Sequence, residues 1–162
     1  MKPPPPDLSR FEHVKALKVA QYIRPLALCC FRRADGRILV APGYDHVKQQ
    51  RFYRPLGGGI EFGERAEDAV RREVREELGA EIEAPRFLGA FENIFTYVGQ
   101  QGHELIWLFE ARFRDQAFYE SDVFEADEDG ARFEVHWVHP SVFEQGEAPL
   151  YPEGLIGLLQ QT

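Results

Sequence analysis

The segment from residue 57 to residue 79 constrains the fold of this chain more than any other. Three consecutive glycines at 57–59 are followed, over residues 64–78, by a stretch rich in Glu, Arg, Ala and Val that contains no Gly or Pro. Gly79 then stands where helices commonly end in a left-handed residue. The pattern predicts a helix over 64–78, preceded by a glycine loop whose backbone is free to approach a ligand.

One face of this predicted helix carries three carboxylates. At 100° per residue, Glu73, Glu76 and Glu77 fall within one arc of about 100°, next to an apolar stripe. Such a group needs compensating positive charge. Arginines of the same helix would supply it on a solvated, ion-paired face, and a divalent cation with oxygen ligands would supply it at a functional site. The adjoining glycine loop favours the second interpretation.

The same residues carry a resemblance to a known family. Gly58, then Glu64, then the run Arg-Glu-Val-Arg-Glu-Glu-Leu-Gly-Ala over residues 72–80 resembles the Nudix box, G-x5-E-x7-R-E-U-x-E-E-x-G-U, where U is a bulky aliphatic residue. All of its fixed positions match. Ala80 is smaller than the usual aliphatic residue, and Leu56 stands where many members have a proline. Neither departure removes a chemical group.

The resemblance implies a hydrolase that cleaves the phosphoanhydride of a nucleoside diphosphate linked to another moiety, with Mg²⁺ or Mn²⁺ as cofactor. It implies an α/β/α sandwich with a mixed β-sheet. In this family pattern Arg72 would orient the carboxylates, and Glu64 would tie the loop to the helix. The metal ligands would be the three box glutamates and a loop carbonyl, namely Glu73, Glu76, Glu77 and Gly57.

The general base and the substrate contacts are less constrained. Glu76 within the box, Glu104, and an acid of residues 120–129 are candidates for the base. Arg51 and Arg54 belong to a basic cluster before the glycines that could meet phosphates, with Arg54 the stronger candidate, or could lie on a solvated edge strand. Tyr97 stands where a tyrosine recurs in members that cut diadenosine polyphosphates, although a strand aromatic is more often part of a core.

The remaining pattern predicts a mixed α+β or α/β fold in a single domain over residues 1–162, with a proline-rich arm at 1–10. The expected elements are a hairpin of 23–32 with 38–41, a strand at 52–56, a hairpin of 86–98 with 103–114, an exposed acidic loop at 120–129, a strand at 133–138, and helical pieces at 140–145 and 152–161. Cys29 and Cys30 are expected to be apolar fillers of a buried strand.

Composition and charge limit the classes of partner that the protein is expected to bind. With 27 acidic and 19 basic residues the formal net charge is −8, which disfavours nucleic acid polymers and anionic lipid. The apolar runs are too short to cross a bilayer, and the first residues lack the apolar region of a signal peptide. We therefore expect a cytoplasmic protein, and the family resemblance implies a small nucleotide as its ligand. A homodimer is compatible with this sequence.

Two alternatives deserve comparison. A non-catalytic nucleotide-sensing module of the same fold would be marked by loss of box glutamates, all of which are present here. Isopentenyl diphosphate isomerase shares the fold but needs a catalytic cysteine and a larger chain. The substrate class stays open between dinucleoside polyphosphates, ADP-ribose, nucleotide sugars and nucleoside triphosphates.

Overall fold

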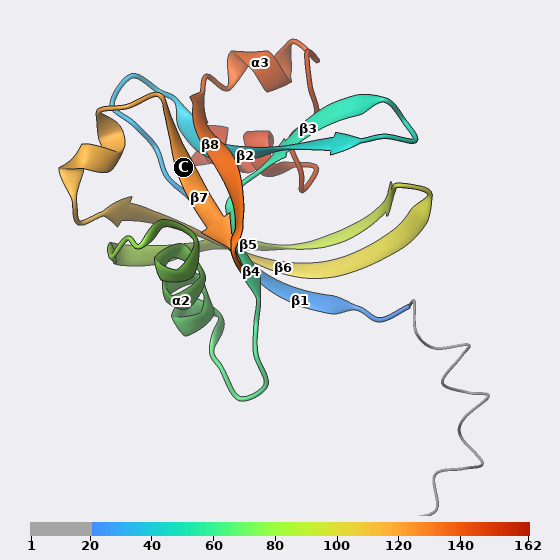
Figure 1. The fold of residues 1–162 in the computed structure, drawn as a ribbon, viewed down its shortest axis with the longest axis horizontal. Helices are drawn as coiled ribbons and strands as arrows, with labels where there is room; N and C mark the ends of the chain where they lie inside the picture. The colour runs from blue at the N-terminus through green and yellow to red at the C-terminus, as the bar shows by residue number, and fades with distance from the viewer. Residues whose placement is uncertain (1–20) are drawn as a thin grey trace, which may run out of the picture.

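The computed structural model describes residues 21–162, so the expected proline-rich arm lies outside the described residues. Two four-stranded sheets make up most of the fold (Figure 1). In spatial order, the first contains β4 (Leu56–Gly59), β1 (Arg24–Cys30), β6 (Gln100–Phe113) and β5 (Ile82–Tyr97), and the second contains β3 (Gln50–Arg54), β2 (Ile38–Asp45), β8 (Ala131–Val138) and β7 (Val123–Glu128). The helical segments are α2 (Ala66–Leu78), the 3₁₀ turn η2 (Gln116–Tyr119), α3 (Ser141–Glu144) and α4 (Leu155–Gln161).

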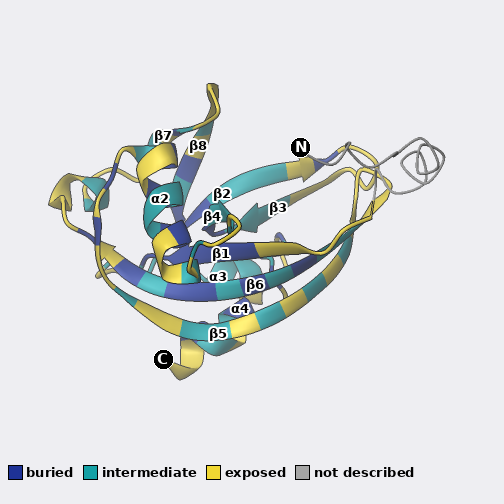
Figure 2. Cartoon of the chain, turned by 90° about the horizontal axis from the view of Figure 1, so that it is seen from below, coloured by how far each residue is buried: buried dark blue, intermediate teal, exposed yellow. Residues whose placement is uncertain are grey.

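The first sheet is mixed and is covered on both faces. β1 runs parallel to β6 and antiparallel to β4, while β5 runs antiparallel to β6. Figure 2 shows α2 and α4 on opposite sides of this sheet. Val74 of α2 belongs to the same core as Cys29, whereas Leu155 of α4 packs in the core that contains Cys30. The prediction of a mixed α and β fold is confirmed.

Both cysteines are buried and free, as expected for apolar fillers of a strand. Successive residues of a strand point to opposite faces, and this alternation places the two thiols in different cores. Among the described residues, no helix is long and apolar enough to cross a membrane.

The predicted hairpin of 23–32 with 38–41 is wrong. The turn itself forms, because Arg33 N–H donates to the Arg37 carbonyl at 2.8 Å and Gly36 N–H donates back to Arg33. Beyond a single bridge between Arg32 and Ile38, however, the strands separate into different sheets. A strand has only two edges, and those of β1 are already occupied by β4 and β6.

The predicted strand at 52–56 and the glycine loop after it also need correction. β3 ends at Arg54 and pairs with β2, and β4 begins at Leu56 and pairs with β1 in the other sheet. Pro55 lies between them, where the chain changes sheets and needs no N–H donor for a ladder. The three glycines therefore form a strand, β4, rather than a loop.

The predicted exposed loop at 120–129 is mostly strand. Phe124 and Ala126 of β7 point into the core and alternate with Glu125 and Asp127, which lie outside it, so the strand presents only one polar face. The hairpin of 86–98 with 103–114, the strand at 133–138 and the two C-terminal helical pieces are confirmed, although α4 starts only at Leu155. The central helix starts at Ala66 rather than at residue 64 and ends as predicted, with Gly79 in the left-handed region at φ 64°.

Candidate active site

The glycines of β4 allow the carboxylate face of α2 to lie directly against the sheet. Gly57 has a φ of 126°, and a Cβ there would come within 2.9 Å of the Leu28 Cα. A Cβ on Gly58 would lie 2.6 Å from the carboxyl carbon of Glu73. Backbone atoms close position 57 to any side chain, whereas a side chain at position 58 would displace the Glu73 carboxylate.

Arg72 connects the helix to the segment that precedes it. Its guanidinium donates to both carboxylate oxygens of Glu64, at 2.8 and 3.0 Å, and to the Gly59 carbonyl at 2.8 Å. It also donates to Glu73 at 2.9 Å and to Glu76 at 3.1 Å. Glu64 in turn accepts from the Glu61 N–H at 3.0 Å. One arginine therefore holds three carboxylates and a strand carbonyl in fixed relation, as its planar fork of donors permits.

Glu77 is the most deeply buried of the box glutamates, at 8% exposure. Burial, and then the neighbouring charge of Glu73, raise the pKa of the Glu77 carboxyl to about 8. The hydrogen bond that Gly57 N–H donates to Glu77 at 3.3 Å acts in the opposite direction and lowers this pKa. Burial also raises the pKa of Glu73. Both shifts reflect the cost of holding two ionised carboxylates side by side here, a cost that a bound cation would offset.

These groups line one open cavity of about 1010 Å³, which we call the carboxylate cleft. Its floor is β4 and the Glu73, Glu76 and Glu77 face of α2, and Arg54 lies on its wall. Three further acids line it from the end of β7 and the turn that follows, namely Asp127, Glu128 and Asp129. The cleft thus collects hard oxygen donors, the ligand type that Mg²⁺ and Mn²⁺ prefer.

The chemistry of this donor set therefore fits a divalent cation, but the side chains are not yet arranged around one. In the part of the chain that the structure describes, no three His, Cys, Asp or Glu side chains form a group that could hold a metal ion. Arg72 takes up one oxygen of Glu73 and one of Glu76. The other oxygen of each carboxylate is not engaged by Arg72 and would be the one to ligate a cation.

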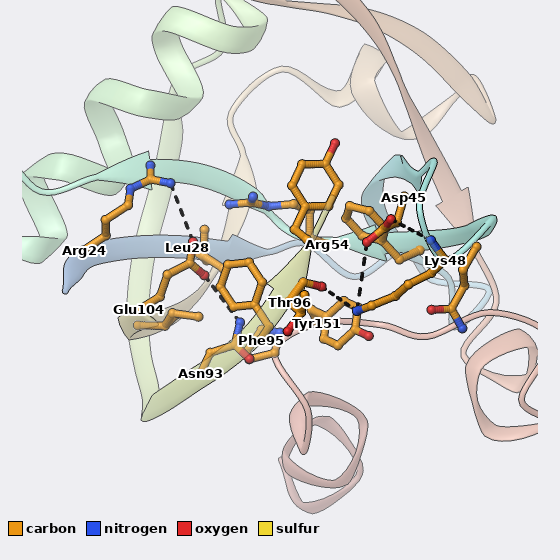
Figure 3. Close-up of a pocket in the computed structure, with 15 residues that line it drawn as sticks. Arg24, Leu28, Asp45, Lys48, Arg54, Asn93, Phe95, Thr96, Glu104 and Tyr151 are labelled. Carbon is orange, nitrogen blue, oxygen red and sulfur yellow. Dashed lines mark hydrogen bonds and ion pairs between the residues drawn. The ribbon is translucent and has the colours of Figure 1, made fainter. Parts of the chain in front are cut away.

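A second, smaller cavity of about 270 Å³ adjoins the cleft, and we call it the aromatic pocket (Figure 3). It lies between the β2–β3 hairpin and the β5–β6 hairpin, and its aromatic lining residues are Phe52, Phe95, Tyr97 and Tyr151. Its polar lining includes Asn93 and Glu104. The two cavities are neighbours, since they share the lining residues Arg24, Phe52, Arg54 and Tyr97.

The tips of the two hairpins are tied together at the far end of the aromatic pocket. The buried carboxylate of Asp45 accepts from the N–H groups of Val47 and Lys48, each at 2.9 Å, and from Val98 N–H of the other hairpin at 3.1 Å. Lys48 also donates to the Thr96 carbonyl. These hydrogen bonds, led by the one from Lys48 N–H, lower the pKa of Asp45.

Comparison with known proteins agrees with this geometry. Residues 23–154 match the family model of the NUDIX domain. The chain belongs to the Nudix family. Among curated Nudix relatives it is 65% identical to the nucleoside triphosphatase NudI of Escherichia coli O139:H28 and 69% identical to that of Escherichia fergusonii, in each case over 26 residues. This match spans 16% of the chain and only 18% of each relative.

Solved Nudix structures resemble the whole fold. The MutT NUDIX hydrolase of Burkholderia pseudomallei matches with a TM-score of 0.60 and 24% identity, covering 88% of this chain and 100% of the other. A NUDIX hydrolase of Nitrosomonas europaea gives 0.61 with 15% identity, covering 86% and 87%. The MutT protein of Methanosarcina mazei Go1 gives 0.59 with 15% identity, covering 89% and 95%. At these identities the likeness shows the fold.

Most candidates from the Nudix pattern meet in the carboxylate cleft. Its lining includes Gly57, Arg72, the three box glutamates, Arg54 and Tyr97. Glu64 reaches this group only through Arg72. Glu104 lines the aromatic pocket instead, and Arg51 lines neither cavity.

Sequence reasoning missed Arg24 and Asn93, and it did not single out Glu128. Arg24 and Asn93 are both register partners of Glu104 across neighbouring strands. For Glu128, the Asp-Gly pair at 129–130 was an available turn signal that would have placed the preceding acid at a hairpin end. Arg24 had no such signal, because its position depends on the parallel pairing of β1 with β6.

Proposed function

We propose that the protein hydrolyses a phosphoanhydride of a nucleoside diphosphate linked to a further moiety, with Mg²⁺ or Mn²⁺ as cofactor. The observation that carries the proposal is the pair of the buried Glu77 and the half-buried Glu73, which lie against the glycines of β4. Placing two carboxylates there costs folding free energy unless a cation is bound, which is characteristic of a functional site rather than a structural one.

In this proposal Glu73, Glu76, Glu77 and the Gly57 carbonyl hold the metal. A divalent cation bound there would neutralise diphosphate charge and lower the pKa of a bound water. Arg54 lies on the wall between the two cavities and is placed to contact the phosphates of a substrate that extends from one to the other. Arg72 acts as a positioning residue, since it holds the carboxylates through hydrogen bonds and is itself tied to Glu64.

The cleft contains two sources for a general base. Glu76 is accessible on α2, with its side chain 58% exposed. Glu128 and its neighbours approach from the end of β7 and the turn that follows, and the charge of Glu128 acts on both Glu73 and Glu77. Glu104, the third candidate, lies in the other cavity. Comparing the pH dependence of kcat in Glu76→Gln and Glu128→Gln would identify the base, because its loss removes the acid limb of the profile.

The decisive experiment is a hydrolysis panel of ADP-ribose, diadenosine polyphosphates, nucleotide sugars and nucleoside triphosphates, with Mg²⁺, with Mn²⁺ and with EDTA. We expect metal-dependent turnover of one class, and its loss in Glu73→Gln and Glu77→Gln. Glu67→Gln is the matched control, because Glu67 is exposed on the same helix, pairs with Arg71 and does not line the cleft. Full metal-dependent activity in both box variants would contradict the proposal.

Binding of a nucleotide without turnover of any panel member would instead indicate the nucleotide-sensing module. We further propose that residues 1–162 act as one domain in the cytoplasm, on small nucleotides rather than nucleic acid polymers. The formal net charge of −8 supports the choice of small substrates. A homodimer is compatible with this proposal, and light scattering would measure the oligomeric state.

A further inference from the structure

The aromatic pocket contains a carboxylate that the proposed hydrolysis does not use. Glu104 is only 5% exposed, yet its recorded partners are weak. Asn93 Nδ2 donates to one oxygen at 3.4 Å, and an Arg24 guanidinium nitrogen lies 3.7 Å from the other, beyond hydrogen-bond distance. A carboxylate offers about four acceptor sites. Arg24 thus balances the charge of Glu104 at a distance, but most of its hydrogen-bond acceptor capacity is free, in a cavity where an unsatisfied acceptor is costly.

The fold places this carboxylate in the middle of a polar row. Arg24 of β1, Glu104 of β6 and Asn93 of β5 are register partners across three adjacent strands and therefore point to the same face of the sheet. Figure 3 shows the three side chains linked at one end of the pocket, with the ring of Phe95 beside them. The row presents one amide donor beside two carboxylate oxygens.

The walls of the pocket are suited to a flat ligand. Phe52 lies across Gly43 and Phe95 lies across Gly102, and a Cβ on either glycine would come within 3 Å of the opposing ring. Because glycine has no side chain, each ring can pack against the backbone of the neighbouring strand, which leaves space for a ligand over the other face of the ring. The volume of about 270 Å³ is just below the usual range for drug-sized ligands, as suits a single nucleobase.

We propose that the aromatic pocket binds the base of a guanine nucleotide, with Glu104 accepting from the adjacent N1–H and N2 amine of the ring. Among the common bases, only guanine carries two neighbouring donors on its Watson–Crick edge. Adenine and cytosine each carry a single donor group, the exocyclic amine, next to a ring acceptor, and uracil and thymine place one donor between two carbonyls. The guanine sequence of acceptor, donor, donor complements the amide of Asn93 followed by the two oxygens of Glu104.

The position of the pocket agrees with such a substrate. A guanine bound beside Glu104 would direct its phosphates past Arg24 and Arg54, which line both cavities, toward the carboxylate cleft. The inference rests on the proposed function only for what happens to those phosphates. Recognition of the base itself depends on the pocket and can be measured without hydrolysis.

The test is the affinity of the full chain for GDP, IDP and ADP, measured by titration calorimetry in EDTA so that hydrolysis is absent. IDP lacks only the N2 amine. We expect GDP to bind roughly tenfold or more tightly than IDP or ADP, because a hydrogen bond to a charged group is lost in each case. In Glu104→Gln the advantage of GDP over IDP should fall below about threefold.

Two further variants separate recognition from folding. Glu92→Gln is the matched control, because Glu92 is an exposed carboxylate on β5 next to Asn93 that pairs with His103. It should keep the full GDP preference. Gly102→Ala pushes the Phe95 ring off the strand and should weaken all three nucleotides together, without changing their order. The ranking of the three nucleotides by the unmodified chain decides the question even if Glu104→Gln does not fold.

Affinities within threefold of one another in the unmodified chain would overturn the inference, as would a GDP preference that survives in Glu104→Gln. A uniform loss for all three nucleotides in Glu104→Gln would mean that Glu104 accepts from sugar hydroxyls, and would also overturn it. A GDP preference without turnover in the hydrolysis panel would uphold the inference and contradict only the proposed function. Turnover without base preference would support the proposed function and overturn the inference about the base.

Discussion

Removing the buried carboxylate at position 77 should make the metal-free protein more stable, even though it should abolish activity. Burial and the charge of Glu73 raise the pKa of Glu77 from the usual 4.5 to about 8. Below pH 4.5 the group is protonated in both the folded and the unfolded chain and contributes nothing. Between pH 4.5 and 8 the unfolded chain releases the proton while the folded chain keeps it, so the free energy of unfolding falls as the pH rises.

The size of the effect follows from the pKa difference. Each pH unit in that window costs about 1.4 kcal/mol, so the loss between pH 4.5 and pH 7 is of the order of 3 kcal/mol. Glu77→Gln has the same shape and does not titrate. Its stability relative to the unmodified chain should therefore rise by about 3 kcal/mol over this range, or about 6 to 12 °C in Tm for a domain of this size.

The assay is thermal unfolding of both proteins in EDTA at pH 4.5 and pH 7. Glu76→Gln serves as the control, because its side chain is 58% exposed and loses little hydration on folding. Saturating Mg²⁺ should then reverse the order, since a ligand stabilises only the protein that binds it. A stability difference between Glu77→Gln and the unmodified chain that is the same at both pH values would refute the reasoning.

Three further outcomes are expected. Gly58→Ala should lower kcat about a hundredfold with α2 still folded, because its Cβ would lie 2.6 Å from the Glu73 carboxyl carbon. In Gly59→Ala the new Cβ would have no atom within 4 Å, so this variant should stay active. Steady-state kinetics measures the activity of both variants, and circular dichroism checks that α2 is folded. Arg72→Lys should lower kcat more than tenfold at unchanged nucleotide affinity, since an ammonium group cannot replace the planar fork of donors. Asp45→Asn should reduce the urea midpoint at pH 7, and the difference should shrink as the pH falls below 3.8, because the lowered pKa of Asp45 stabilises the fold only while the group is ionised.

Local patterns in the sequence were sufficient to predict the parts of the fold that depend on neighbouring residues. The helix before Gly79 and the hairpin formed by β5 and β6 follow from periodicity and turn residues alone. The separation of β1 from β2 does not, because it depends on which distant strands occupy the edges of β1. β7 was mistaken for a loop because its acids outnumber the two residues, Phe124 and Ala126, that anchor it in the core.

The same distinction applies to the site. The carboxylate cleft was predictable because its main residues lie within one helix and the strand before it. The aromatic pocket was not, since Arg24, Asn93 and Glu104 meet only when β1 pairs in parallel with β6 and β5 pairs with β6. The sequence therefore offers Glu104 only as a candidate general base, whereas the folded chain places it between Arg24 and Asn93 in the aromatic pocket.

The adjacent cysteines of β1 provide a way to observe the two layers of the molecule separately. Burial raises the pKa of the Cys30 thiol to about 12 and that of Cys29 well above its usual value, so neither is a nucleophile in the closed protein. Alkylation then requires local opening. In a Cys30→Ala protein the labelling rate of Cys29 would report separation of α2 from the sheet, and in a Cys29→Ala protein the rate for Cys30 would report release of α4. The labelling rates of two adjacent thiols thus report local opening on the two faces of one sheet independently.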